Sequence, residues 1–577
     1  MNRNSTFYLL ALLYFFTSPV LYALNESNSA DNPQKTIEQE LESKPKAKPN
    51  CSAPDVSINQ GELCGLNVKT TNDKQTYAYL GIPFGETTAG DSRWRAPVPD
   101  SGWQGKLEAT QHGLACPQIN RFVSDLPYSE DCLTLNVWSP DINPDKPKAV
   151  VVYILGGSYL YGYAGNPVYD GSYVSANGDI VLVTMNYRTG SFGFLAGVKD
   201  KDTGEKIDGN FGLMDQVLAM KWVKENIAKF GGDPNQITLH GESAGAGSVA
   251  IHLTGEPSTT GLFNNVIMQS NPLGMPFKSL IESKPIAQEF ANKLSCANND
   301  ISCMRSKSAK EIVEAQNMAQ AGVNLLLHGM KDFLIWGPVI DNKIVNGNTV
   351  LEISKKKNTK PTVIGTNENE AVLFVAFAMN KLGLNNLSDA EYSLALEVLF
   401  RSNKVKDKIL KKYPHQGSNN ESSLSAVLTD YLFTCPSLYL ADNSSMKTWV
   451  YLFDHVPSYN LFSIIGVSAC KEAVCHAAEV PFVFHTAENL GYQFTEQERI
   501  LSRTMINYWT NFVKNIDPNG ILPEGILPHW PKYKSQESNV ILVTPIDKIV
   551  SKQDLRARCE FWNEIGYDQH HSLWDLF

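Results

Sequence analysis

A serine between two glycines is the part of the chain that points most directly to chemistry. Residues Gly241 to Gly245 read GESAG around Ser243, and they follow a short apolar run, Ile237 to Leu239, that predicts a buried strand. Glycines at both ends allow a sharp turn from a strand into a helix, because no side chain collides where backbone meets backbone. The segment predicts a nucleophile elbow with the Ser243 hydroxyl at its tip. Five such residues alone also arise by chance in loops.

The residues around this serine extend the pattern. Phe230 to Gly245, FGGDPNQITLHGESAG, resembles in full the active-serine signature of the type-B carboxylesterase and cholinesterase family. Glu130 to Pro140, EDCLTLNVWSP, resembles a second signature of that family, and the resemblance runs from Cys51 to Phe561. It implies an α/β-hydrolase fold, with a mainly parallel central sheet flanked by helices and large helical insertions.

A serine hydroxyl needs a base to take its proton and an acid to orient that base. His476 lies in a segment, Val474 to Phe484, that resembles the family's histidine segment, and Glu370 follows a predicted strand. The chain order Ser243, Glu370, His476 is the nucleophile, acid, base order of α/β-hydrolases. Glu368 lies in the same loop and competes as the acid, although the motif favours Glu370.

Attack on an ester carbonyl builds negative charge on its oxygen, and fixed N–H donors must stabilise that charge. The segment Ile154 to Tyr159 resembles the family's His-Gly-Gly-Gly loop, which implies an oxyanion hole of the backbone N–H groups of Gly157, Ser158 and Ala244. Leu155 and Ser158 depart from the family pattern. The added hydroxymethyl group of Ser158 is expected to narrow the part of the site that holds the acyl group of the ester.

Further residues are assigned supporting roles. Glu242 resembles a carboxylate that supports the nucleophile in this family, and Ser270 resembles a supporting hydroxyl. Five aromatic residues are candidates to line an apolar cleft: Tyr159, Tyr161, Phe333, Trp336 and Phe374.

The predicted reaction is two-step acyl transfer through an acyl-enzyme on Ser243, and neither a metal nor an organic cofactor is expected. The predicted substrate is an uncharged carboxylic ester, either a small molecule or a lipid. Three alternatives stay open: a lipase for longer acyl chains, hydrolysis of amides or peptides by the same triad, and a non-catalytic cholinesterase-like binding or adhesion module. The loop between Cys116 and Cys132 lacks the tryptophan that cholinesterases carry there, which argues against a dedicated choline esterase.

Ten cysteines fit a protein that folds in an oxidising compartment. The resemblance implies three disulfides: Cys116 with Cys132, Cys296 with Cys303, and Cys435 with Cys559. Cys51, Cys64, Cys470 and Cys475 remain, and spacing alone leaves their pairing open. A bridge between Cys470 and Cys475 would stiffen the segment that presents His476. Metal binding is disfavoured because no Cys-x-x-Cys pair is present.

The N-terminus predicts export. Residues 1–23 resemble a cleaved signal peptide, with Arg3 ahead of the apolar run Phe7 to Phe16; the alternative is a membrane anchor, although the run is shorter than the ~20 residues that span a bilayer. Residues 24–50 are polar and predict a disordered linker, and 51–577 are expected to form a single α/β-hydrolase domain without a membrane span. The expected location is secreted or periplasmic.

The formal net charge of -10 argues against a nucleic-acid surface. Apolar runs predict strands at 149–155, 180–185, 237–239, 266–268 and 362–364. Helical patterns occupy 213–230, 285–294, 309–319, 390–401 and 496–513. Strands that alternate with helices predict a mainly parallel sheet covered on both faces. The sequence indicates no oligomeric state.

Overall fold

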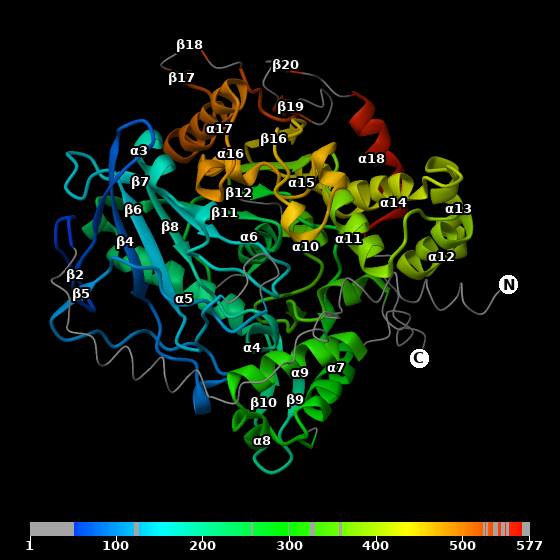
Figure 1. Ribbon diagram of the computed structural model, residues 1–577, viewed down its shortest axis with the longest axis horizontal. Helices are drawn as coiled ribbons and strands as arrows, with labels where there is room; N and C mark the ends of the chain where they lie inside the picture. The colour runs from blue at the N-terminus through cyan, green and yellow to red at the C-terminus, as the bar shows by residue number, and fades with distance from the viewer. Residues whose placement is uncertain are drawn as a thin grey trace.

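A mixed sheet of 11 strands runs through the protein (Figure 1). The strands, in order across the sheet, are β20 (Lys548–Ile549), β19 (Val540–Val543), β16 (Thr448–Phe453), β15 (Thr362–Asn367), β12 (Asn265–Gln269), β11 (Gly232–Glu242), β7 (Lys148–Ile154), β8 (Val181–Met185), β6 (Thr134–Ser139), β4 (Gln75–Pro83) and β3 (Leu66–Lys69). Neighbours from β19 to β8 pair in parallel, whereas β6, β4 and β3 at one edge and β20 at the other pair antiparallel. The predicted α/β class with a mainly parallel sheet is confirmed.

This computed structural model describes residues 51–119, 126–255, 258–297, 299–322, 329–356, 360–522, 525–526, 529–534, 540–543, 548–549 and 553–567. The predicted signal peptide, residues 1–23, and the predicted linker, residues 24–50, lie outside the described residues.

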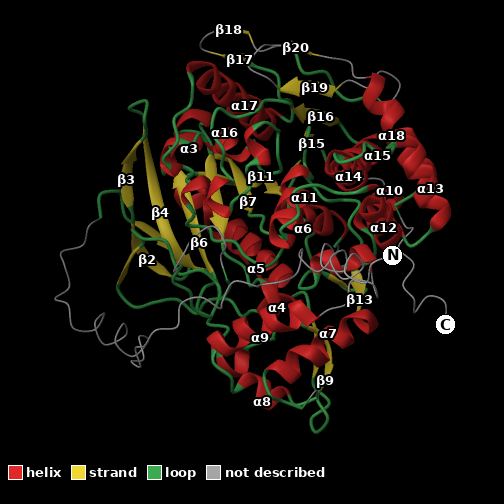
Figure 2. Ribbon diagram, turned by 45° about the vertical axis from the view of Figure 1, so that its right-hand side comes forward, coloured by secondary structure: helices red, strands yellow, loops and turns green. Residues whose placement is uncertain are grey.

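Helices cover both faces of the sheet, as its continuous apolar strands require. One face packs against α3 (Ser172–Gly178) and α17 (Glu496–Asn515), with α16 (Val480–Phe484) beside them. The opposite face packs against α5 (Phe211–Asn226) and α6 (Ala244–Thr254), and Figure 2 shows the two groups on opposite sides of the strands. Each central strand is therefore buried on both sides, which explains runs such as Val150 to Val152.

Two groups of inserted helices extend beyond this core (Figure 1). The first comprises α7 (Leu280–Lys293), α8 (Ile301–Arg305) and α9 (Ala309–Gly322), next to the hairpin of β9 (Ala196–Lys199) and β10 (Lys206–Asp208). The second comprises α11 (Val372–Leu382), α12 (Asp389–Phe400), α13 (Asn403–Lys412), α14 (Asn420–Leu428) and α18 (Gln553–Ile565). These are the helical insertions that the family resemblance implied.

The remaining elements are short. They are β1 (Val56–Ile58), β2 (Gly61–Cys64), β5 (Lys106–Glu108), β13 (Lys278–Ser279), β14 (Val339–Ile340), β17 (Ile521–Leu522), β18 (Gly525–Ile526), α4 (Gly190–Phe194), α10 (Thr349–Lys356) and α15 (Cys435–Asn443). The 3-10 turns are η1 (Gly90–Ser92), η2 (Pro167–Tyr169), η3 (Ile227–Phe230), η4 (Gly329–Leu334), η6 (Ser463–Ile465), η7 (Ala469–Lys471) and η8 (Glu488–Leu490), and η5 (Thr429–Thr434) is π-helical.

Local chemistry explains where several helices begin. Capping boxes start α7 at Ser279 and Glu282, α12 at Ser388 and Glu391, and α17 at Thr495 and Glu498, so backbone N–H groups that lack a helical partner are satisfied. The helix predicted at 213–230 ends four residues early, because Ile227–Phe230 tightens into the 3-10 turn η3 before Gly231 adopts a positive φ of 79°. The strand predicted at 237–239 lies in the buried second half of the longer β11, and residues 233–236 before it are more exposed and carry no apolar signal.

All ten cysteines form disulfides. The pairs are Cys51–Cys64, Cys116–Cys132, Cys296–Cys303, Cys435–Cys559 and Cys470–Cys475. Three of these are the pairs that the resemblance implied, and the other two join the cysteines whose pairing the spacing left open. Among the described residues, no helix is both long and apolar enough to cross a membrane.

Candidate active site

Ser243 occupies a strained turn between β11 and α6. Its φ of 56° and ψ of -125° lie in a region that residues with a side chain rarely adopt. A Cβ on Gly241 would lie 2.4 Å from the carbonyl carbon of Gly245, and one on Gly245 would lie 1.9 Å from the carbonyl oxygen of Ile154. The turn therefore requires glycine at both positions, for the reason that the sequence pattern suggested.

Glu370 and His476 meet although 106 positions separate them. Glu370 lies in the turn after β15, which ends at Asn367, and is fully buried. Its Oε2 lies 2.6 Å from Nδ1 of His476. Its other oxygen, Oε1, accepts a hydrogen bond of 2.8 Å from the N–H of Asn367, which fixes the carboxyl group. A proton on Nδ1 then points to the carboxylate and leaves Nε2 free to act as a base.

The competing acid, Glu368, takes no part in this pair. Its N–H donates to the carbonyl oxygen of Phe453, and its Oε1 lies 3.7 Å from Nη1 of Arg558 on α18. Glu370, which the motif favoured, is therefore the carboxylate that contacts His476.

The outer nitrogen of His476 faces a second carboxylate. Nε2 lies 3.3 Å from Oε1 of Glu242, and neither atom has a hydrogen-bond partner among the described residues. Within the same residues there is no hydrogen bond from the Ser243 hydroxyl to Nε2, although both side chains line one cavity. Hydrogen bonds between catalytic groups are commonly long before substrate binds.

Charge and burial together set the pKa values of His476 and Glu242. Burial lowers the pKa of His476, but the negative charges of Glu242 and Glu370 outweigh it and raise the pKa to about 9. Burial raises the pKa of Glu242 to about 8. The first shift requires Glu242 to be ionised and the second favours its neutral form, so the two groups titrate as a pair. At neutral pH both shifts therefore favour one proton on the two groups together, carried by His476 or by Glu242.

A third buried carboxyl group, Glu479, was missed by sequence reasoning. It is fully buried, and it accepts hydrogen bonds from Asn367 Nδ2 at 2.6 Å and Gln269 Nε2 at 3.0 Å. Burial raises the pKa of Glu479. The Ser270 hydroxyl, predicted to have a supporting role, donates to Glu479 at 3.4 Å. The signal in the sequence is a glutamate three residues after His476, where α16 begins.

The candidate oxyanion loop lies directly against the nucleophile. A Cβ on Gly156 would lie 3.0 Å from Cβ of Ser243, and Gly157 and Ser158 both have positive φ, 112° and 56°. Within the described part of the chain, no group accepts a hydrogen bond from the N–H of Gly157, Ser158 or Ala244. Three unengaged donors beside a serine are what a developing oxyanion needs.

Two cavities meet at Ser243. The large cavity has a volume of about 350 Å³, and the small cavity has a volume of about 60 Å³. Ser158, Ser243 and Phe374 line both. His476 and Glu242 line only the large cavity, whereas Ala244 lines only the small cavity.

Apolar and aromatic side chains form most of both walls. The large cavity is lined by residues that include Tyr161, Tyr163, Tyr169, Leu461, Phe462, Ile464 and Tyr492. The small cavity is lined by residues that include Tyr159, Pro272, Met275, Phe333, Leu334, Leu428, Leu432 and Phe433.

Four of the five predicted cleft aromatics therefore lie at a cavity, and Trp336 is the exception. Trp336 packs in a separate apolar cluster, with its ring 5.5 Å from that of Phe290 on α7. The ring centroids of Phe374 and Phe433 lie 5.0 and 5.2 Å from the centroid of the His476 imidazole. Phe433 belongs to the π-helical turn η5, a local distortion that apolar periodicity does not reveal.

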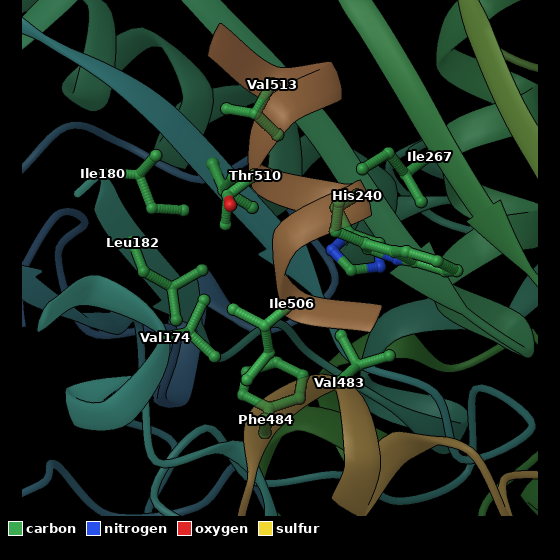
Figure 3. A pocket seen from close by; sticks show the side chains of 12 residues that line it. Val174, Ile180, Leu182, His240, Ile267, Val483, Phe484, Ile506, Thr510 and Val513 are labelled. Atoms are coloured by element: carbon green, nitrogen blue, oxygen red, sulfur yellow. The ribbon is translucent and has the colours of Figure 1, made fainter. Parts of the chain in front are cut away.

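Another buried histidine, His240, takes part in packing. It precedes the elbow on β11, and burial lowers its pKa to about 4 while its Nε2 lies 2.6 Å from Oε1 of Gln269. His240 also lines a cavity of about 20 Å³ that is otherwise almost entirely apolar (Figure 3). The walls of this cavity come from strands of the sheet and from α3, α16 and α17, and Ser243 does not line it.

The carboxylesterase family matches the chain over residues 52–562. The chain is 35% identical over 527 residues to the crystal protein of Dictyostelium discoideum, covering 89% of this chain and 91% of that protein. It is 32% identical over 483 residues to the cAMP-regulated D2 protein of the same organism, with 81% and 86% covered. It is 31% identical over 548 residues to acetylcholinesterase-1 of Trittame loki, with 88% and 94% covered. The chain belongs to the carboxylesterase family.

Proposed function

We propose that this protein is a serine carboxylesterase that hydrolyses uncharged carboxylic esters through Ser243, His476 and Glu370. The observation that carries the proposal is the position of His476, which contacts the Glu370 carboxylate through Nδ1 and lines the large cavity together with Ser243. A lone serine or a lone histidine is more often structural. A strained serine, a carboxylate-bound imidazole and unengaged N–H donors at one cavity favour nucleophilic catalysis.

The reaction proceeds in two steps. His476 Nε2 takes the proton of Ser243 while the oxygen of Ser243 bonds to the ester carbonyl carbon, and Glu370 stabilises the imidazolium. The N–H groups of Gly157, Ser158 and Ala244 stabilise the oxyanion. When the carbon–oxygen bond to the alcohol breaks, the alcohol takes the proton from Nε2. Water then attacks the acyl-enzyme in the same way and releases the acid and the free serine.

The two cavities have different roles in this mechanism. The leaving alcohol must lie beside Nε2 to receive its proton, and His476 lines only the large cavity. The alcohol part of the ester therefore occupies the large cavity and the acyl part the small one. The favoured substrate is an ester of a short acid with a larger, apolar alcohol.

The protein is further proposed to be exported, either secreted or periplasmic. Five disulfides support passage through an oxidising compartment. Residues 1–23 would be removed as a signal peptide, 24–50 would form a linker, and 51–577 would form a single α/β-hydrolase domain.

The test uses the oxidised protein from Leu24 onward. We expect turnover of p-nitrophenyl acetate and covalent labelling of Ser243 by a fluorophosphonate, located by mass spectrometry of the labelled peptide. Ser243→Ala removes both signals while its circular dichroism spectrum matches wild type. Ser302→Ala, on the exposed side of α8, serves as the matched control and keeps both. A folded wild-type protein with neither turnover nor labelling would favour the binding-module alternative, and a preference for long acyl chains would favour a lipase.

A further inference from the structure

A buried lysine joins two walls of the small cavity. Lys278 is 4% exposed and lies in β13, whose backbone pairs with Val339 of β14. Its Nζ donates hydrogen bonds of 2.5 Å to the carbonyl oxygen of Leu334 and 3.1 Å to that of Lys331. The segment before Lys278 contributes Met275 to the cavity, and η4 contributes Phe333 and Leu334. One ammonium group therefore links both segments.

Burying the ammonium group of Lys278 costs free energy that its contacts must offset. A charged lysine is rarely buried, because water solvates the charge far better than the protein interior does. Here the charge lies against carbonyl oxygens at the end of a 3-10 turn, the end where the backbone dipoles leave negative charge. The backbone of Lys278 pairs with β14, so its ammonium group links η4 to a paired strand.

A second lysine, Lys331 within η4, ties the same turn to α7. Nζ of Lys331 lies 2.7 Å from Oε1 of Glu282, and both side chains are largely buried. Oε2 of Glu282 accepts hydrogen bonds from the N–H and the hydroxyl of Ser279, which closes the capping box of α7. The turn η4 is thus tied to β13 by Lys278 and to the start of α7 by Lys331.

We propose that Lys278, with Lys331 in support, determines acyl-chain specificity by holding η4 against the segment of Met275. This inference rests on the proposed esterase function and on the assignment of the acyl group to the small cavity. With η4 fixed, Phe333 and Leu334 close the far side of a cavity of only about 60 Å³. Neither lysine lines the cavity, so each acts as a positioning residue.

The test compares p-nitrophenyl acetate with p-nitrophenyl hexanoate. Lys278→Met keeps the length of the side chain but removes its donors, so the carbonyls of Leu334 and Lys331 lose their partner and η4 loosens. We expect the hexanoate-to-acetate ratio of kcat/KM to rise about tenfold, the discrimination that a methylene group makes in an apolar pocket. The kcat for acetate stays near wild type. Lys278→Arg restores donors and returns the ratio toward wild type, and Leu334→Ala raises it directly.

Two results would overturn the proposal. An unchanged ratio with retained acetate turnover would show that Lys278 only stabilises the fold. If Lys278→Met does not fold, Lys331→Met releases η4 from Glu282, and an unchanged ratio in that variant has the same meaning. Wild-type protein without Ser243-dependent acetate turnover would overturn the proposed function and this inference together, which distinguishes that failure from a failure of Lys278 alone.

Discussion

Nε2 of His476 lies 3.3 Å from Oε1 of Glu242, while Nδ1 on the other side of the same ring lies 2.6 Å from Oε2 of Glu370. The imidazole thus stands between two carboxyl groups, and both partners are almost fully buried. In the proposed mechanism, only the contact with Glu370 orients His476 as the base. The other favours the protonated ring, which cannot accept the proton of Ser243.

Glu242→Gln is expected to shift the pH dependence of activity toward lower pH. His476 must be neutral to accept the proton of Ser243, and its pKa is raised to about 9. The kcat/KM of the wild-type protein should therefore rise with pH as His476 loses its proton. Removal of the Glu242 charge removes one cause of the raised pKa. The midpoint of the rising limb should then fall, as measured with p-nitrophenyl acetate across a buffer series. Glu496→Gln, at the exposed start of α17, is the control. An unmoved midpoint would show that Glu242 does not set the titration.

Ser243→Gly is expected to be inactive and more stable than Ser243→Ala. The φ of 56° at this residue strains any side chain, and such strain costs about 1 to 3 kcal/mol. Glycine relieves it, whereas alanine keeps the Cβ and its strain. Thermal unfolding of the two variants measures the difference, with the melting temperature higher for glycine. An equal or lower melting temperature for glycine would mean that the gain in unfolded-chain entropy outweighs the strain.

Removal of two different disulfides is expected to affect stability and activity to different extents. Cys435–Cys559 closes a loop with a sequence separation of 124, and its removal should lower the free energy of unfolding by about 4 to 5 kcal/mol in the chain-entropy account. Cys470–Cys475 has a separation of 5, so its removal should cost about 2 kcal/mol.

Removal of Cys470–Cys475 should lower kcat more than removal of Cys435–Cys559. Val474 and Asn369 exchange two hydrogen bonds of 3.1 Å, and the Asn367 side chain donates to the carbonyl of Cys475 at 2.8 Å. The small disulfide loop therefore fixes His476 relative to the loop of Glu370. Replacing both cysteines of this loop with alanine should lower kcat on the order of 10- to 100-fold. The kcat of each variant is measured relative to the concentration of folded protein. Equal kcat for the double variants of Cys435–Cys559 and Cys470–Cys475 would contradict a specific role of the small loop in placing His476.

Glu479→Gln is expected to lower kcat by about tenfold and leave KM nearly unchanged. The carboxyl group accepts hydrogen bonds from Asn367 and Gln269, and an amide in its place turns a donor toward a donor on one side. The disturbance reaches Glu370 through the N–H of Asn367, and neither cavity contains Glu479 in its wall. Steady-state kinetics at the pH optimum measure the effect, and Glu479→Asp tests partial rescue. A change confined to KM would indicate a role in substrate binding instead.

The sequence predicts those features whose cause is local. The glycines around Ser243 are required by contacts within and beside the elbow. The acid segment lies just beyond β15, whereas His476 lies in the loop between η7 and α16 and is identified by its motif alone. Glu479 and Lys278 carry no comparable pattern. The role of Glu479 arises only when β12 and β15 lie side by side, and that of Lys278 only when η4 packs against β13. Trp336 shows the converse: an aromatic residue near the cleft aromatics in sequence packs into a separate cluster, since side-chain direction depends on tertiary packing.

The two cavities also draw their walls from different stretches of the chain. Pro272 to Met275, η4 and η5 enclose the small cavity, whereas 161–169 and 461–464 contribute to the large one. A designer of biocatalysts can therefore vary the segments of one wall in a combinatorial library while the other wall and the elbow stay intact. Enzymes that discriminate between acids and enzymes that discriminate between alcohols would be reachable from this scaffold by separate and combinable sets of substitutions.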